Sequence, residues 1–367
     1  PPPPPTTMVS SSAASDVYKR QLKRDLPAAE AQLRTAVEID PDDPVSRASL
    51  ADLLMAKKES GAAENEYAAI TRKAPKDPIG YLRLSRLYLT ENKPERALAV
   101  LEDGYAKNQR SAALLTSLIQ MYVRQNRSDK AVALCETRIK ENARDVFAYN
   151  LLGWVYSQSQ DFGRAEKALN TAIELQPMWP SPHNNLAKLY LAQGRKQEAT
   201  VKFESSIQAN PQNASAYLSL ALLYEKDREF KKAMNVYERA LAQNPNFWFA
   251  ANNLAFLLAE SSRSKADYER AMDLALGALK LRPGDPAVLD TLGWAHYRLG
   301  NYSQAGELIE QGLAGAPDAA ILNYHMGMVH YANGQKEAAK VSLQKALENE
   351  GDFYGRDIAQ KTLKEMS

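Results

Sequence analysis

Few side chains in this 367-residue chain have the types and spacing that support catalysis. The histidines are His183, His296, His325 and His330, and the 34-residue interval between His296 and His330 would suit a shared metal site. Cys135, the one cysteine, is the candidate thiol nucleophile. The sequence contains no H-E-x-x-H, Walker, G-x-G-x-x-G or nucleophile-elbow motif. We therefore predict no catalytic residue, no metal and no cofactor, and expect a protein that is not an enzyme.

Charge offers a different chemistry, that of binding. The 46 Lys and Arg nearly balance the 44 Asp and Glu, so the whole chain gives no argument for binding nucleic acid or an anionic membrane. Residues 72–130, however, hold 12 basic against 6 acidic side chains. Guanidinium groups pair with carboxylates through parallel hydrogen bonds. This stretch therefore predicts either a site for an acidic peptide or C-terminal carboxylate, or a solvated basic face.

A sequence repeat must position these side chains. Alanines recur every 34 residues from Ala29 to Ala233 and, after one step of 38, from Ala271 to Ala339. An apolar residue follows four positions after nearly every one, and proline follows twelve positions after most. Leu or Met, followed by a small residue, stands thirteen positions before most of them. Two apolar stretches per unit at helical spacing, the second stopped by proline, predict a pair of antiparallel helices, A and B.

The repeat register also reinterprets the candidates for chemistry. His296 and His330 fall where other units carry tyrosine on helix A, which favours a structural role over a metal site. Cys135 falls on an apolar position of helix B, so we interpret it as a small core residue.

The pattern resembles that of the tetratricopeptide repeat family over residues 24–350. The family's run of W, L-G, Y, A, F, A, P is read most clearly at Tyr149, Leu152, Gly153, Tyr156, Ala165, Leu169, Ala172 and Pro177. The resemblance implies an all-α fold: a right-handed superhelical solenoid of about nine full repeats, with an orphan N-terminal helix and a C-terminal capping helix. It also implies a non-catalytic scaffold that binds a peptide or helix of a partner protein.

The register divides the chain into four parts. Residues 1–21 lack apolar periodicity and are interpreted as non-native or disordered. Residues 22–43 hold a B helix alone, residues 44–350 hold nine repeats, and residues 351–367 are expected to form a capping helix. Because the first B helix lacks an A partner, we expect the natural chain to continue upstream.

Two units depart from the pattern. In unit 112–145, Ile119 replaces the small residue of helix A and Arg138 replaces the last alanine of helix B, so packing there is expected to be irregular. In unit 248–283, four additional residues are expected to lengthen the turn between the helices, around Ser261–Asp267. This turn is either a tolerated insertion or a recognition loop.

Family members bind partners along their A helices, so the resemblance also implies site residues. Asparagines at the fifth A-helix position resemble the asparagine-lined groove of O-GlcNAc transferase repeats, or else they are solvated or bond the neighbouring unit. Aromatic residues at the ninth position are either interface anchors or part of inter-repeat packing. The candidates are Arg86, Arg124, Asn150, Trp154, Asn184, Lys188, Asn252, Phe256, Asp290, Trp294, Tyr297, Met328 and Tyr331.

A second resemblance concerns the stretch DTLGWAHYRLG, Asp290 to Gly300. It is similar to the terminal repeats of bacterial envelope tetratricopeptide lipoproteins of exopolysaccharide-export and exosortase systems. That implies a role in assembling such a complex, associated with the periplasm or outer membrane, and leaves the cytoplasm open. The alternative is a substrate-docking arm of a larger enzyme whose catalytic domain lies outside this chain. No run is long enough for a transmembrane segment, and the oligomeric state is not predicted.

Overall fold

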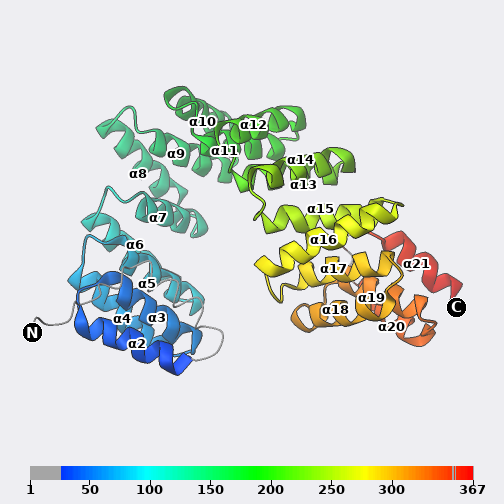
Figure 1. Ribbon diagram of the computed structural model, residues 1–367. Helices are drawn as coiled ribbons and strands as arrows, with labels where there is room; N and C mark the ends of the chain where they lie inside the picture. The colour runs from blue at the N-terminus through cyan, green and yellow to red at the C-terminus, as the bar shows by residue number, and fades with distance from the viewer. Residues whose placement is uncertain (1–25, 349–350, 352, 367) are drawn as a thin grey trace, which may run out of the picture. The chain divides into compact units, whose positions relative to one another are not determined.

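The computed structural model describes residues 26–348, 351 and 353–366, and its elements within these ranges are all α-helices. The segment 1–21 lies outside the described residues. Figure 1 labels the helices along the chain. The twenty helices of these ranges fall into two compact units, divided between Leu175 and Gln176. The predicted all-α fold of paired helices is therefore confirmed.

The first unit alternates B and A helices. In order, they are α2 (Leu26–Ile39), α3 (Pro44–Ala56), α4 (Ser60–Lys73), α5 (Pro78–Thr90), α6 (Pro94–Lys107), α7 (Ala112–Arg124), α8 (Ser128–Glu141), α9 (Val146–Gln158) and α10 (Phe162–Leu175). The odd-numbered helices are A helices, and each packs against the B helix that follows it.

The second unit continues the same alternation. Its helices are α11 (Pro180–Ala192), α12 (Lys196–Ala209), α13 (Ala214–Lys226), α14 (Phe230–Gln243), α15 (Trp248–Ser261), α16 (Lys265–Leu281), α17 (Pro286–Arg298), α18 (Tyr302–Gly315), α19 (Ala320–Ala332), α20 (Lys336–Glu348) and α21 (Arg356–Glu365). The last of these packs against α19 and α20. No helix in the described residues is both long and apolar enough to cross a lipid bilayer.

Local chemistry explains where the A helices begin. The carboxylates of Asp43, Asp77 and Asp285 accept backbone N–H groups of the first turns of α3, α5 and α17. A proline occupies the next position in each case, where its missing N–H costs nothing and its fixed φ suits a helix. These caps set the starting point, and so the rotation, of each A helix.

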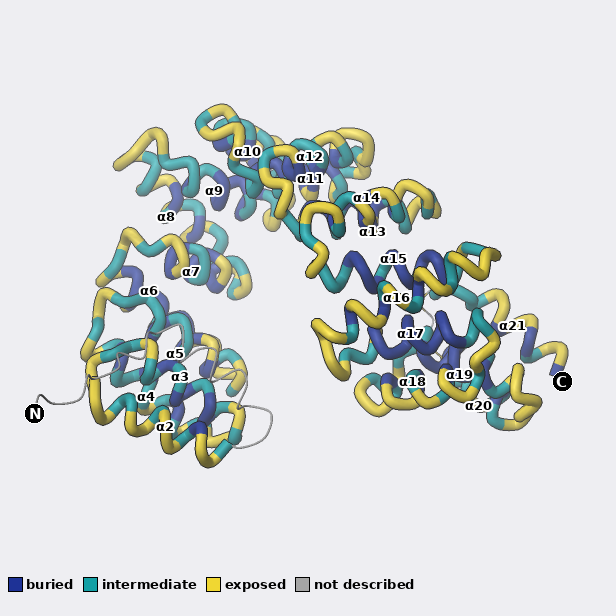
Figure 2. The backbone as a smooth tube through the Cα atoms, in the orientation of Figure 1, coloured by how far each residue is buried: buried dark blue, intermediate teal, exposed yellow. Residues whose placement is uncertain are grey.

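The core follows the alanine ladder. All ten ladder alanines are at most 3% exposed, and Figure 2 shows the buried stripe along the helices. A Cβ atom on Gly153 would lie 2.5 Å from Cγ of Leu169 and 3.1 Å from the carbonyl oxygen of Ala165. The small residue of helix A therefore permits the close approach of helix B.

In the irregular unit 112–145, two changes compensate for the unusual residues Ile119 and Arg138. Ile119 is fully buried, and so is Cys135, which stands where most other units carry a larger side chain. The Arg138 guanidinium donates to Oδ2 of Asp145, the cap of α9, at 2.7 and 3.0 Å and to the carbonyl oxygen of Gln109 at 2.8 Å. An ion pair thus replaces the usual alanine contact.

The expectation of a longer turn in unit 248–283 is wrong. Helices α15 and α16 are joined by residues 262–264, the same three-residue length as every other turn between an A helix and the B helix that follows it in the described residues. The additional residues extend the helices instead: α15 has 14 residues and α16 has 17. The Arg298 guanidinium donates to the carbonyl oxygen of Ser262 at 3.1 Å and so holds this turn. The protein therefore has no recognition loop here.

Candidate functional site: the A-helix faces of the two units

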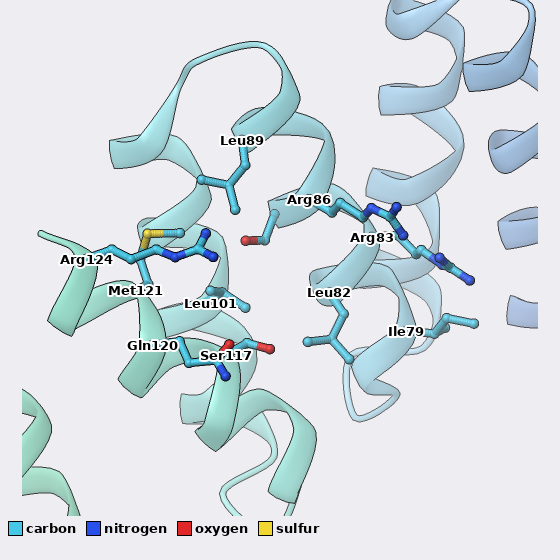
Figure 3. A pocket seen from close by; sticks show the side chains of 11 residues that line it. Ile79, Leu82, Arg83, Arg86, Leu89, Leu101, Ser117, Gln120, Met121 and Arg124 are labelled. Atoms are coloured by element: carbon cyan, nitrogen blue, oxygen red, sulfur yellow. The ribbon is translucent and has the colours of Figure 1, made fainter. Parts of the chain in front are cut away.

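A groove of about 430 Å³ lies between A helices α5 and α7 of the first unit (Figure 3). Helix α5 lines it with two arginines, a serine and apolar side chains, α7 with one arginine, two polar side chains and a methionine, and α6 with one leucine. The lining residues are Ile79, Leu82, Arg83, Ser85, Arg86, Leu89, Leu101, Ser117, Gln120, Met121 and Arg124. The structure thus brings two predicted residues, Arg86 and Arg124, to one surface.

The charges in this groove are unequally paired. The side chains of Arg86 and Arg124 are exposed, and neither forms an ion pair with the described residues. Arg83 lies 3.3 Å from a carboxylate oxygen of Asp52 on α3. Gln120 lies one helical turn before Arg124, on the same face of α7. The groove therefore presents two guanidinium groups whose hydrogen-bond donors are available for an anionic ligand.

The predicted asparagines are mostly enclosed. Asn150 and Asn252 are 6% and 7% exposed. Asn184 is half-buried, and its Nδ2 donates to Oγ of Ser215 at 3.3 Å. The buried Oδ1 atoms of Asn184 and Asn252 accept no hydrogen bond from the described residues. These oxygens would need a side-chain rotation to reach a peptide.

Three candidates in the second unit, Trp294, Asp290 and Tyr297, belong to one cluster, and the first two of them are buried. Trp294 is 3% exposed, stacks on His325 at a ring separation of 3.9 Å, and donates from Nε1 to Glu260 at 2.9 Å. Asp290 is also 3% exposed, and its two oxygens lie 2.9 and 3.0 Å from Nδ1 of His325. Tyr297 stacks on Trp294 at 4.5 Å. These contacts match the inter-repeat packing that was the alternative interpretation of Trp294.

Sequence reasoning missed the role of His325. Asp290 lies 35 residues earlier, and the stacking of consecutive A helices brings the two side chains together. The spacing of one repeat plus one residue was the available signal.

The remaining candidates are more accessible. Lys188 is exposed, Trp154 is half-buried, and Tyr331 is 36% exposed. Phe256 and Met328 are half-buried, and both contact the C-terminal part of the chain. The contacts of that part with the A helices were not foreseen, because it lies beyond the last repeat and has no register.

Two of the residues that were considered for chemistry, Cys135 and His296, are buried. Burial raises the pKa of the Cys135 thiol to about 12, so the nucleophilic thiolate is disfavoured. Burial also lowers the pKa of His296. Among the residues that the structure describes, no three His, Cys, Asp or Glu side chains gather as a metal site would require.

Comparison with known proteins agrees with the fold. Family models described as tetratricopeptide repeat match residues 22–86, 82–144, 150–214, 190–260 and 291–350. The chain therefore belongs to the tetratricopeptide repeat family. Its stacked helix pairs form the kind of scaffold on which proteins of this family bind protein partners.

Individual relatives add less. The TPR repeat-containing protein PA4667 of Pseudomonas aeruginosa is 38% identical over 78 residues, which are 21% of this chain and 12% of that protein. A chain of the APC/C hetero-tetramer Cut9–Hcn1 matches 97% of this chain and 83% of its own length, at 12% identity and a TM-score of 0.51. YrrB, a TPR protein with an unusual peptide-binding site, matches 51% of this chain and 96% of its own, at 16% identity and a TM-score of 0.32. The likeness to the Cut9–Hcn1 chain shows the fold alone.

Proposed function

We propose that the groove between α5 and α7 binds an extended acidic segment of a partner protein. The observation that carries the proposal is that Arg86 and Arg124 line one groove without an ion pair to any described residue. Each guanidinium can hold a carboxylate through two parallel hydrogen bonds. Leu82 and Leu89 supply apolar surface between the charges. A segment that alternates acidic and apolar side chains fits this lining.

The test uses a defined probe and reversed charges. A short fluorescent peptide that alternates Glu and Leu is titrated with the protein, and its counterpart with Gln is the neutral control. Arg86→Glu combined with Arg124→Glu should weaken binding by about tenfold or more, because each charged hydrogen bond contributes about 1.5–3 kcal/mol. Arg72→Glu with Arg110→Glu changes the net charge equally outside the groove and should have little effect. Equal affinities for the two double variants would contradict the proposal.

The other accessible candidates extend the proposal along the A helices. Trp154, Lys188 and Tyr331 present side chains that would contact further parts of partner segments. The buried candidates Trp294 and Asp290 would act by holding α17 and α19 in place. Substitution of an exposed candidate in either unit should weaken binding of a partner segment to that unit without changing the melting temperature, and a titration with a melting curve measures both.

We propose, more specifically, that this scaffold helps assemble a bacterial envelope complex for polysaccharide export or protein sorting. The support is the similarity of Asp290 to Gly300 to envelope tetratricopeptide lipoproteins, together with the bacterial relative matched over 78 residues. Fractionation of the source cells is the measurement. Recovery with the envelope is the expected result, and recovery in the cytosol would contradict it.

The alternative proposal is a docking arm of a larger enzyme. The tetratricopeptide fold is generally a non-catalytic scaffold, so any catalysis would come from a domain outside this chain. Comparison of the complete gene product with this chain distinguishes the two, because a transferase or kinase domain in the same polypeptide would favour the docking arm.

A further inference from the structure

The last segment of the chain lies against the A-helix face of the second unit. The ring of Tyr354 meets Phe256 of α15 edge-on at 5.1 Å and lies 5.7 Å from Phe230, the first residue of α14. The Tyr354 hydroxyl hydrogen-bonds to the carboxylate of Glu225 on α13. One side chain from beyond the last repeat therefore contacts three helices of earlier repeats.

The carboxylate of Glu225 is held in place by neighbouring side chains. It accepts a hydrogen bond from the hydroxyl of Tyr237 at 2.6 Å, and that hydroxyl accepts one from Nδ2 of Asn253 at 2.9 Å. Burial raises the pKa of the Glu225 carboxyl group. A partly desolvated carboxylate needs donors, and Tyr354 supplies one of the two that it has among the described residues.

The backbone of the segment also fits its surroundings closely. Gly355 has φ of +86°, and a Cβ atom there would lie 2.2 Å from the ring of Tyr324. Only glycine satisfies both the conformation and the approach. Phe353 lies 5.9 Å from the same Tyr324 ring. An aromatic pair followed by glycine is therefore what this surface accepts.

The occupied surface is a groove rather than a closed core. About 580 Å³ remains open beside the segment, with Leu222 and Ile358 on its lining 47% and 46% exposed. Lys226 and Arg228 also line it. The segment thus fills part of a groove with apolar walls and a charged rim, as a bound peptide would.

The helix that follows the segment is weakly anchored. Helix α21 has ten residues, and its buried side chains are the small Ala359 and Thr362. A helix of this length is marginal without tertiary packing. Its release would therefore cost little compared with the opening of a complete repeat.

We propose that residues 353–358 are a built-in ligand of the second unit, and that a partner segment with the same chemistry, two aromatic residues followed by glycine, displaces them. The groove of the second unit is then a second protein-binding site, normally covered by the chain itself. This site is independent of the groove between α5 and α7 that holds Arg86 and Arg124, called the arginine groove below. Either proposal can therefore fail without the other.

The test is binding of the segment in trans to the full-length chain. A fluorescent synthetic peptide of residues 353–366 should bind the wild-type protein weakly, because the tethered copy competes at an effective concentration of about a millimolar. Tyr354→Ala removes the tethered anchor, so the peptide should bind this variant at least about tenfold more tightly. Val201→Ala, an exposed position on α12 outside the lining of this groove, is the control and should behave as wild type.

A second peptide and a milder variant complete the design. A peptide of residues 353–366 that carries Tyr354→Ala should not bind the Tyr354→Ala protein more tightly than it binds the wild-type protein. If the alanine variant loses helical circular dichroism, Tyr354→Phe replaces it. Phenylalanine retains the ring and loses only the hydrogen bond to Glu225, so the peptide should bind this variant about threefold more tightly than wild type. Absence of any gain in a folded variant would overturn the proposal. A wild-type dimer that exchanges the segment between copies would also overturn it.

Discussion

Burial sets the charge state of His296. The side chain is 9% exposed, and loss of water lowers its pKa below the ordinary value of 6.5. Equivalent positions in five earlier units carry tyrosine instead of histidine. The histidine therefore introduces a pH dependence that those units lack at this position.

Replacement of His296 by Phe should reduce that pH dependence. Because the unfolded chain binds the proton more readily than the folded protein, the free energy of unfolding falls as pH drops from 6.5 through the lowered pKa. His296→Phe removes this contribution, so its unfolding midpoint in urea should change less over that range than the wild-type midpoint. Comparison of the two proteins at pH 8, where the imidazole is neutral, gives the reference. Identical slopes would contradict the argument.

At the scale of the helix pair, one unit reverses which of the two facing helices carries the larger side chain. Gly153 on α9 faces Leu169 on α10, whereas the equivalent pair in unit 112–145 is Ile119 and Cys135. Both members of the second pair are fully buried. A large residue on helix A is thus accommodated by a small one on helix B.

This exchange predicts strong coupling between two substitutions. Cys135→Leu should overpack the α7–α8 interface and cost about 1–3 kcal/mol of unfolding free energy. Ile119→Ala should leave a cavity and cost about 2–5 kcal/mol. The double variant should cost less than the sum by at least about 1 kcal/mol. Chemical denaturation of the four proteins measures this difference, and simple additivity would show that the two side chains do not share one space.

Much of the fold was predictable at this scale because each repeat contacts only its neighbours, so its structure depends on nearby sequence. The alanine ladder fixes the register, and caps such as Asp77 fix where helices begin. The lengthened α16 was mispredicted, since helix propensity in the stretch after Ser264 outweighed the expectation that insertions fall in turns. The shared surface of Arg86 and Arg124, which stays a proposed site, was predictable because it depends on register. Contacts that cross many repeats, as for Tyr354, were not predictable.

For the whole molecule, the near-neutral net charge of +2 means that attraction of an acidic partner must be local. Binding at the arginine groove and binding at the groove that residues 353–358 occupy should therefore depend differently on salt concentration. Exposed ion pairs are screened within about 8–10 Å at physiological ionic strength, whereas aromatic contacts are not.

Salt should separate the two proposed sites in one preparation. Raising the ionic strength from about 0.05 to about 0.5 M should weaken the acidic peptide at Arg86 and Arg124 by about tenfold. The affinity of the 353–366 peptide for the Tyr354→Ala variant should change by less than about threefold, because contacts between aromatic rings dominate this binding. Fluorescence anisotropy at several salt concentrations measures both. Equal salt dependence would show that the two sites do not differ in chemistry.

The complete burial of Cys135 has a practical consequence. Thiol-reactive dyes attack through the thiolate, and this thiol is inaccessible with its pKa raised to about 12. The sequence has no other cysteine. A cysteine introduced at Gln120, on the lining of the arginine groove, would therefore be the single labelling site of the folded protein. A fluorophore attached there would report the arrival of a partner in real time, with no need to remove a native thiol first.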